Sequence, residues 1–473
     1  MAELSSLQLY RMVGRQKGSL LRRFFHASFS IALRVFFRRL ETHDEDRAPQ
    51  TGPVIFVMNH PNGIIDPALV FCALPRRISF LAKSTLFDVP GIGLLLRTVD
   101  ALPLYRQVDN ADRAQNQRTF AACFARLREG RCIALFPEGQ SVPVSKMLPV
   151  KTGAARIALG AISLAGQELS EPLRIQPVGL YYSSLTKMRG EVLLRFGEPF
   201  AVAPVVLNDK GEPPREAVLE LTKRIETALH AVTLNVESHD ELAEIRHAEE
   251  LFSSVYETLN VRESLTESFR RLRNLAAGLK HYGAQAPGEA ESLRARVRSY
   301  EKELKTLGLT PQMLSVSEHS KWYIFWHVIA RAWLLLVLTP IALVGAVIHL
   351  PAQAISIWAG RKLSKHDVDE SVSTVQMLSA MFWMPVTWLV VSGLVYWHWG
   401  WQAGLIAFPA TILAGYIALK TVEGWADLRG WVKAAWVLLR QRGLFLRLLL
   451  ERKALHHELE KLGDDMEQNR QIE

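Results

Sequence analysis

The first half of the chain alternates short apolar runs with longer segments of helical period. Apolar runs bounded by Gly, Pro or charged residues predict β-strands. These runs occupy residues 54–58, 78–82, 132–136, 175–182 and 191–196. Helical periods lie between them, at residues 110–129 and from residue 151 onward. Strands that alternate with helices predict an α/β layered domain with a mixed β-sheet.

Residues 20–40, ahead of these strands, predict a basic amphipathic helix. The apolar side chains are Phe24, Phe25, Phe29, Ile31, Ala32, Val35 and Phe36. Arginines border this apolar surface, as in helices that lie in a membrane interface. Packing on the folded core is the alternative, and the two do not exclude each other.

The segment from residue 214 to residue 309 is charged and helical in period. It carries two apolar stripes, Leu251-Val255-Leu259 and Leu265-Phe269-Leu272. Residues 440–462 predict another charged helix, with Leu444, Leu448, Leu455 and Leu459 on one stripe. Both segments predict helical appendages that pack an apolar face and carry no chemistry of their own.

Two blocks contain no Asp, Glu, Lys or Arg, residues 332–360 and residues 371–419. A membrane span needs about 20 apolar residues. The second block therefore predicts two spans, 377–397 and 401–419. The first block is long for one span and short for two, and it contains Pro340, Gly345 and Pro351. Tryptophans from Trp322 to Trp436 suit anchors at the membrane interface.

Positive charge bears on the number of crossings. Arg361, Lys362 and Lys365 lie between the two blocks, and basic residues also follow the second block. Loops rich in Lys and Arg favour the cytosolic side. The sequence leaves two forms open for residues 332–360. If they crossed once, the basic linker after them would lie on the far side, whereas a shallow or re-entrant hairpin keeps every basic cluster on the cytosolic side. We therefore expect an even number of crossings and both termini in the cytosol.

These patterns divide the chain into five parts. We expect amphipathic membrane-associating helices over 1–50, a catalytic domain over 51–213, a helical appendage over 214–320, membrane-embedded helical hairpins over 321–419 and a charged helical tail over 420–473.

Net charge and cysteine content limit the class of binding partner and the cellular compartment. The formal net charge of +9 favours an anionic partner. No nucleic-acid-binding signature is evident, and basic residues cluster beside apolar ones, so we expect anionic membrane lipids rather than nucleic acid. The three cysteines are scattered, which predicts neither a disulfide framework nor a metal site and fits a reducing compartment. The arginines that interrupt each early apolar run argue against a secretory signal.

Candidate chemistry follows two of the predicted strands. Residues 59–66 read NHPNGIID after the first strand, and residues 136–139 read FPEG after the third. Histidine can take a proton from a hydroxyl near neutral pH. An aspartate within reach can fix its tautomer and stabilise the imidazolium. His60 and Asp66 are therefore candidates for activating an alcohol.

Four segments together resemble the conserved blocks of the phospholipid/glycerol acyltransferase family. They are residues 59–66, 102–106 (LPLYR), 136–139 and 176–179 (QPVG), in the family's order. The resemblance covers about residues 50–205. The whole layout is similar to that of bacterial proteins related to glycerol-3-phosphate acyltransferases. It implies an integral protein of a bacterial inner membrane with a cytosolic catalytic domain.

The resemblance implies an O-acyltransferase of phospholipid synthesis. A fatty acyl group would pass from acyl-coenzyme A or acyl carrier protein to a hydroxyl of glycerol-3-phosphate or 1-acylglycerol-3-phosphate. His60 would be the general base, and Asp66 would orient it. No Gly-x-Ser-x-Gly nucleophile elbow is present, in agreement with direct attack by the acceptor. No metal and no bound cofactor are implied.

The resemblance also assigns residues to the acceptor. Arg106, in the second block, is the first choice for the phosphate. Glu138 and Gly139 would shape the acceptor site, and Ser141 would add a hydroxyl. Lys151 lies just before a predicted helix start, where a cation and free amides attract an anion. Lys83 is a weaker candidate, and taken alone both lysines are ordinary solvated charges.

Two departures from the family's pattern concern these blocks. Five residues separate His60 from Asp66, whereas the common first block has four. The extra residue falls in the turn-forming triplet Pro-Asn-Gly. Gln140 and Ser141 stand where the third block often continues with Thr-Arg. More of the phosphate binding would then fall on Arg106 and Lys151.

Two other functions remain open from the sequence. One is acylation of another lysophospholipid or of an aminolipid at the same site. The other is a non-catalytic membrane scaffold with a relic of the catalytic domain. His60 taken alone could simply cap a turn, but His60, Asp66 and Glu138 are all present. Buried groups of this kind are costly to retain without use.

Overall fold

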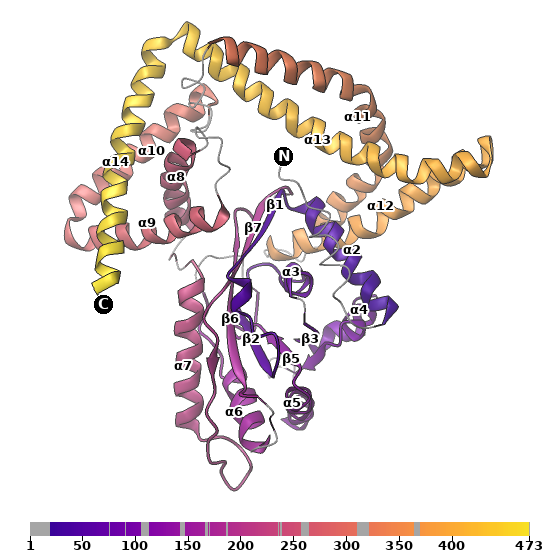
Figure 1. Cartoon of the computed structure of the whole chain (residues 1–473), viewed down its shortest axis with the longest axis vertical. Coiled ribbons are helices and arrows are strands. Elements are labelled where there is room, and N and C mark those ends of the chain that lie inside the picture. The colour runs from indigo at the N-terminus through magenta and orange to yellow at the C-terminus, as the bar shows by residue number, and fades with distance from the viewer. Residues whose placement is uncertain are drawn as a thin grey trace. The chain divides into compact units, whose positions relative to one another are not determined.

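The computed structural model gives the structure of the chain as two compact units (Figure 1). Unit 1 comprises residues 1–235 together with residues 360–377, and unit 2 comprises the remainder. The structure describes residues 19–74, 76–89, 91–105, 113–141, 147–165, 169, 171–185, 188–234, 236, 239–256, 264–309, 321–363 and 369–472.

Unit 1 is built on one mixed sheet. Its strands are β1 (Arg39–His43), β2 (Val54–Met58), β3 (Ile78–Lys83), β4 (Leu102–Leu104), β5 (Cys132–Leu135), β6 (Arg174–Tyr182), β7 (Glu191–Phe196) and β8 (Phe200–Ala201). The strand order is β1-β7-β6-β2-β5-β3-β4, with β8 also paired to β6. The strands from β6 to β4 run parallel, and β6 pairs antiparallel with β7 and β8. The predicted α/β fold with a mixed sheet is confirmed.

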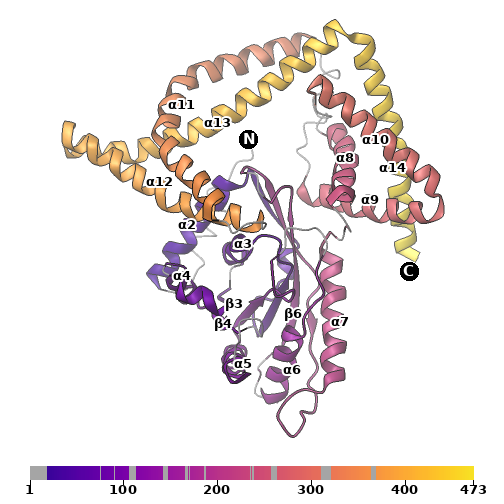
Figure 2. The same cartoon turned by 180° about the vertical axis from the view of Figure 1, so that it is seen from behind.

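The main core lies on one face of this sheet. It is covered by α5 (Arg113–Arg128), α6 (Gly153–Ala165) and α7 (Arg215–Val232). Ile55 and Val57 of β2 point to this face, because side chains alternate along a strand. All five residues of β2 are buried, as expected for a central parallel strand covered on both faces. Figure 2 shows α6 and α7 beside the sheet.

The other face carries α2 (Leu20–Phe36), α3 (Ile65–Ala73) and α4 (Ile92–Thr98), and two 3₁₀ turns follow β1 and β3 (Glu45–Arg47 and Ser84–Asp88). Helix α2 buries Phe29 and Leu33 and leaves Phe24 and Ile31 exposed. Its buried face contacts α3, where the Arg22 guanidinium lies over the Phe71 ring. The helix therefore packs on the core and still presents apolar side chains outward.

The predicted helix over residues 20–40 is too long at its carboxyl end. It stops at Phe36, and residues 39–43 form β1, which pairs in parallel with β7. Arg39 aligns with Glu191 in this ladder. The local sequence alone favoured helix here. Hydrogen bonding to β7 makes residues 39–43 a strand instead, because strand formation depends more on tertiary contacts than on local propensity.

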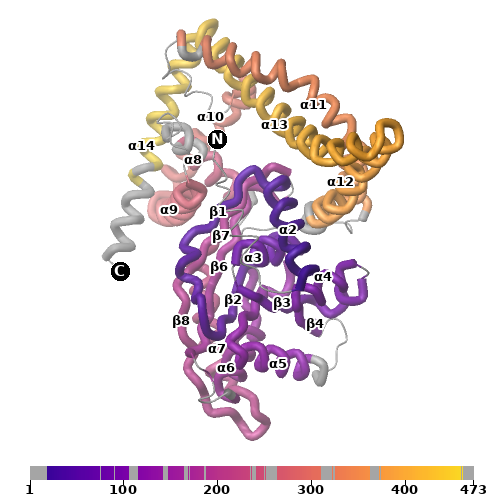
Figure 3. Tube along the Cα trace, turned by 45° about the vertical axis from the view of Figure 1, so that its right-hand side comes forward, coloured from indigo at the N-terminus to yellow at the C-terminus, as the bar shows by residue number. Residues whose placement is uncertain are grey.

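Unit 2 contains a bundle of four helices (Figure 3), α8 (His239–Tyr256), α9 (Leu265–Gln285), α10 (Pro287–Leu307) and α14 (Arg442–Ile472). Phe269 and Leu272 of α9 are buried in it, as are Leu455 and Leu459 of α14. The sequence predicted two separate helical segments, the appendage and the charged tail. In the structure their apolar stripes pack within one bundle.

Three long helices complete the chain, α11 (Lys321–Leu363), α12 (Asp369–Trp399) and α13 (Trp401–Arg440). The break between α12 and α13 falls at Gly400, as the two predicted spans require. By length and composition, the stretches Phe325–Lys362 and Thr374–Arg440 can cross a membrane.

Of the two forms left open for residues 332–360, the hairpin is ruled out, because α11 is one continuous helix with Pro340 and Pro351 inside it. Proline removes one backbone donor, but apolar helices tolerate it where neighbouring groups satisfy the freed carbonyls. Close packing supports the same region, where Gly345 lies against the Ala414 backbone of α13.

The three cysteines allow a test of the core of unit 1. Cys72, Cys123 and Cys132 are buried and free, and burial raises the pKa of each thiol, to about 12, 12 and 11 respectively. Only the thiolate attacks a disulfide reagent, so reactivity should rise only as the pH approaches these values.

We therefore expect no thiol of the native protein to react with Ellman's reagent at pH 8. The same protein unfolded in guanidinium chloride should titrate three thiols per chain. Rapid reaction of even one thiol in the native state would contradict the packing of this core.

Candidate active site

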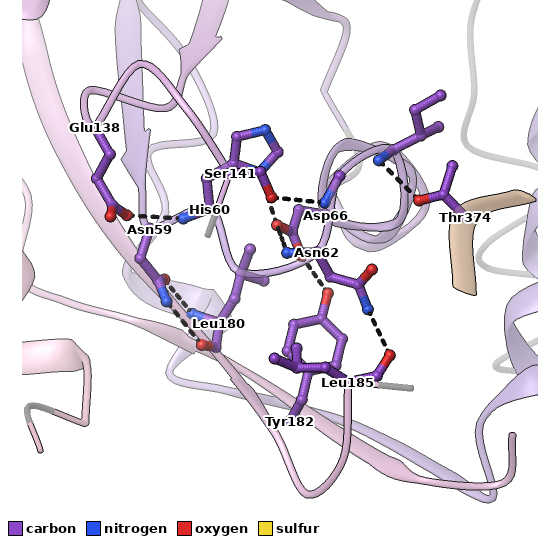
Figure 4. A network of polar contacts seen from close by, with 12 residues as sticks. Asn59, His60, Asn62, Asp66, Glu138, Ser141, Leu180, Tyr182, Leu185 and Thr374 are labelled. Atoms are coloured by element: carbon purple, nitrogen blue, oxygen red, sulfur yellow. Dashed lines mark hydrogen bonds and ion pairs between the residues drawn. The ribbon is translucent and has the colours of Figure 1, made fainter. Parts of the chain in front are cut away.

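The candidate site lies where parallel strands β2 and β5 end side by side. Val57 of β2 pairs with Leu135 of β5, so the loops that follow both strands leave the sheet at the same edge. Residues 59–66 follow β2 and residues 136–141 follow β5. The ends of parallel strands commonly carry binding sites in α/β folds. Figure 4 shows the polar contacts that join these loops.

His60 and Asp66 are in direct contact. The imidazole Nδ1 lies 2.8 Å from Asp66 Oδ2. Because the carboxylate accepts, Nδ1 carries the proton and donates, which leaves Nε2 unprotonated in the neutral ring. The His60 side chain is 18 % exposed, whereas that of Asp66 is fully buried. The imidazole of His60 is therefore partly accessible, while the carboxylate that holds it is enclosed.

Three donors satisfy the buried Asp66 carboxylate. Oδ2 accepts from His60 Nδ1 and from the Asn62 backbone N–H at 2.7 Å, and Oδ1 accepts from the Tyr182 hydroxyl. Asp66 also lies in the first turn of α3, where the helix dipole favours a negative charge. Burial, with the Asp66 charge beside it, raises the pKa of Tyr182 well above its usual value, so the phenol stays a donor.

The loop after β5 fixes the histidine from the other side. The Phe136 ring stacks on the imidazole, with centroids 4.0 Å apart. Glu138 Oε1 accepts from the His60 backbone N–H at 2.9 Å, and Oε2 accepts from the Leu148 N–H at 2.9 Å. Burial raises the pKa of Glu138, although these two N–H groups lower it in part. Glu138 thus joins the histidine backbone to the segment around Leu148.

Asn59 anchors the start of the catalytic loop. Its side-chain Nδ2 donates to the Leu180 carbonyl at 2.9 Å, and its Oδ1 accepts from the Leu180 N–H at 2.7 Å. These two bonds continue the pairing of β2 with β6 beyond Met58, which aligns with Val178. The chain therefore reaches His60 from a fixed point.

Two hydroxyls contact the middle of the same loop. Ser141 Oγ accepts from the Gly63 N–H at 2.9 Å, and Thr374 Oγ1 accepts from the Ile64 N–H at 3.3 Å. The described contact of Ser141 is to the loop, and its role as an acceptor-binding hydroxyl stays a prediction. Thr374 belongs to the first turns of α12, in the part of that helix that lies in unit 1.

Of the three cationic candidates for the phosphate, the structure gives most detail for Lys151. The Lys151 backbone N–H donates to the Pro137 carbonyl, and its exposed side chain runs over Gly139, where a Cβ would lie 2.6 Å from Lys151 Nζ. Gly139 also has a φ of +72°, which favours glycine. Lys83 ends β3. Arg106 lies outside the described residues.

This arrangement suits base catalysis on an acceptor hydroxyl. Nε2 of a neutral imidazole can take a proton, and a buried carboxylate on Nδ1 stabilises the charged ring that results. Among the described residues no group of three His, Cys, Asp or Glu side chains could hold a metal ion.

The sequence profile of the acyltransferase family matches residues 39–181. We refer to this part of the chain, by its similarity to that family, as the acyltransferase domain. It begins with β1, contains both loops of the site and ends one residue before Tyr182. A second profile, described as the glycerol-3-phosphate acyltransferase 2 C-terminal domain, matches residues 250–467.

Named relatives extend the comparison. Glycerol-3-phosphate O-acyltransferase 2 of Saccharomyces cerevisiae is 24 % identical over 381 residues, which cover 77 % of this chain and 48 % of that protein. Lyso-ornithine lipid O-acyltransferase of Brucella abortus is 29 % identical over 184 residues, 38 % of this chain and 61 % of that protein. The chain spans about half the length of the curated relatives it matches.

Among solved structures, that of the 1-acyl-sn-glycerophosphate acyltransferase of Thermotoga maritima aligns with a TM-score of 0.32 and 18 % identity, covering 49 % of this chain and 83 % of that chain.

Three contacts of the acyltransferase domain were missed in the sequence. Tyr182 ends a predicted strand, where alternation identifies it only as a buried side chain. Leu148 contributes its backbone, which carries no sequence signal. Thr374 is one polar residue in a long uncharged block, and nothing in the sequence points to residue 64.

The Tyr182 hydroxyl can be tested alone. The Tyr182→Phe change removes one of the three donors to a buried carboxylate, and hydrogen bonds to charged groups contribute about 1.5–3 kcal/mol. We expect kcat for acyl transfer to fall about tenfold with little change in KM, because Asp66 would hold the imidazole less firmly.

The control for this variant is Tyr181→Phe, which removes a hydroxyl from the opposite face of β6 and should retain activity. Steady-state kinetics of the two purified variants decide the question. Equal activity of both would remove Tyr182 from the site.

Proposed function

We propose that this protein is an O-acyltransferase of glycerolipid synthesis that moves a fatty acyl group from a thioester to a hydroxyl of a glycerol phosphate. The observation that carries the proposal is the His60–Asp66 pair, with Nδ1 on the buried carboxylate and Nε2 left as a base. The acyltransferase family match and the yeast relative support the same class of reaction.

The step follows from these groups. As the acceptor oxygen attacks the thioester carbonyl, its proton passes to His60 Nε2, and a tetrahedral intermediate forms. Collapse of this intermediate breaks the C–S bond, and the imidazolium returns the proton to the leaving thiolate. Asp66 stabilises the imidazolium both while the acceptor attacks and while the intermediate collapses. The products are an ester and a free thiol, so atoms and electrons balance without a redox cofactor.

Glu138 receives a different role from the one its motif implied. Both of its carboxylate oxygens accept hydrogen bonds from backbone N–H groups, and the residue as a whole is only 5 % exposed. We therefore propose that Glu138 holds the backbone of His60 in place. Gly139 leaves room for the Lys151 ammonium, which we propose as a phosphate ligand together with Arg106.

The acceptor is the least constrained part of the proposal. Matches to glycerol-3-phosphate acyltransferases, both in the yeast relative and in the C-terminal profile, favour glycerol-3-phosphate over its 1-acyl derivative. The Brucella relative, named for a lyso-ornithine lipid, favours an aminolipid as the second candidate. The donor would be acyl-coenzyme A or acyl carrier protein in either case.

We also propose that the protein works as an integral membrane protein. Many large apolar side chains of α11, α12 and α13 are exposed, which is unfavourable in water and favourable in lipid. Exposed apolar side chains and arginines on α2 suit contact with anionic lipids. A cytosolic catalytic domain with cytosolic termini stays our expectation for topology. It now rests on α14, which follows the apolar helices and packs with α8, α9 and α10, which precede them, so that both segments lie on the same side of a membrane.

The catalytic pair defines the main test. His60→Ala and Asp66→Asn should each lower acyl transfer by about 100-fold or more, since general-base catalysis contributes about 10²–10⁴-fold. The assay uses purified protein in detergent, a radiolabelled acyl thioester and three acceptors: glycerol-3-phosphate, 1-acylglycerol-3-phosphate and lyso-ornithine lipid.

The chain supplies a matched control, because His43 Nε2 and Asp44 Oδ2 also form a pair, 3.3 Å apart, at the more exposed end of β1. His43→Ala should keep full activity. Transfer by the wild type to none of the acceptors would refute the proposed function, and full activity of both His60→Ala and Asp66→Asn would refute the mechanism.

A further inference from the structure

The catalytic loop is held at three consecutive backbone amides. The N–H groups of Asn62, Gly63 and Ile64 lie between His60 and Asp66. Ile64 is the residue that caps α3, and Gly63 has a φ of +33°. Asn62 and Gly63 precede α3, and Ile64 caps it, so none of the three N–H groups takes part in the hydrogen bonds within the helix. Backbone N–H groups shielded from water are nearly always paired, so each of them needs an acceptor.

Each of these amides has an acceptor from a different element. The Asn62 N–H donates to Asp66 of α3 itself. The Gly63 N–H donates to the hydroxyl of Ser141, in the loop after β5. The Ile64 N–H donates to the hydroxyl of Thr374, in α12. Thr374 is only 7 % exposed, so its hydroxyl contact is largely shielded from water.

The last two contacts matter because glycine gives the loop freedom. Gly63 can adopt many backbone conformations, and the structure holds it at a φ of +33° with His60 Nδ1 on Asp66. The Asn62 contact depends on Asp66 and cannot fix the loop independently. The hydroxyls of Ser141 and Thr374 are fixed from outside the loop and can therefore select its conformation.

We propose that Ser141 and Thr374 are positioning residues that hold the catalytic loop in its active conformation. The proposal rests on the proposed acyl-transfer function. Neither hydroxyl needs to touch a substrate for this role. Ser141 acts within the acyltransferase domain, whereas Thr374 comes from the region that matches the C-terminal profile. The loop of the acyltransferase domain is thus completed by a helix from outside that domain.

This role extends to the long apolar helix itself. Thr374 is the first residue of the stretch Thr374–Arg440, which is apolar enough to cross a membrane. Met377, one turn later on the same helix, is buried as well. The amino-terminal turns of α12 thus support the catalytic loop at the point where its apolar segment begins.

Kinetics of single variants test the positioning role. Ser141→Ala and Thr374→Val should each lower kcat about fivefold to tenfold, with KM for donor and acceptor changed less than twofold. Thr374→Ser restores the hydroxyl and should recover most of kcat. The double variant should lose less than the product of the two single losses, because both hydroxyls hold one loop.

Two control variants make the same chemical changes elsewhere. Ser163 Oγ accepts the Val205 N–H at 3.0 Å, so Ser163→Ala also removes a serine acceptor from a backbone amide. Thr387→Val removes a threonine hydroxyl within α12, where it donates to the Trp383 carbonyl. Both controls should keep kcat within twofold of the wild type.

Hydrogen exchange on the full-length protein gives a readout that does not depend on activity. In Ser141→Ala and Thr374→Val, peptides that contain Gly63 and Ile64 should exchange faster, whereas peptides from β2 should not. Unchanged exchange and unchanged kcat in both variants would overturn the proposal. Faster exchange in a protein without acyl transfer would support the loop contacts while refuting the proposed function.

Discussion

The site depends on one fully buried carboxylate. A buried charge is costly unless it is paired and hydrogen-bonded. Asp66 meets this requirement with donors from three places: the imidazole of His60, the backbone of its own loop and the phenol at the end of β6. The fold must therefore bring α3, the catalytic loop and β6 together before the carboxylate can be buried. The same contacts orient the imidazole, so folding and catalytic geometry share one set of interactions.

The sheet supplies the frame for this constraint. Strand β2 lies between β5 and β6, so the loop after β5 and the end of β6 both contact the segment from Asn59 to Asp66. The loop after β5 adds the Phe136 ring beside the imidazole and the Glu138 carboxylate on its backbone. These contacts leave the exposed part of the ring as its working side. An acceptor can approach a base whose orientation is already set.

The sequence predicts much of this frame and less of what surrounds it. Runs such as residues 54–58 predict strands because every side chain is apolar, and two of the five predicted strands have the bounds seen in the structure. β1 was missed because its charged residues show no apolar run. The distribution of basic residues favoured a hairpin at residues 332–360, but α11 runs through Pro340 and Pro351 as one helix, so charge alone did not predict its form. The His60–Asp66 contact agrees with the motif, but backbone contacts such as Glu138 to His60 depend on tertiary structure. One hydrogen bond joins the two departures from the family pattern: the N–H of Gly63, in the longer loop, donates to the hydroxyl of Ser141.

The Asn59 side chain limits how far the catalytic histidine can move. Because its amide group both donates to and accepts from the Leu180 backbone, strand β2 is in effect one residue longer than its main-chain ladder. The imidazole is attached to the next residue, so it gains little freedom from backbone motion and must rely on its two side-chain torsions. Stacking on Phe136 and the bond to Asp66 restrict those torsions as well. The entropy of ordering the base is thus lost once, when the chain folds, and is not lost again in each turnover.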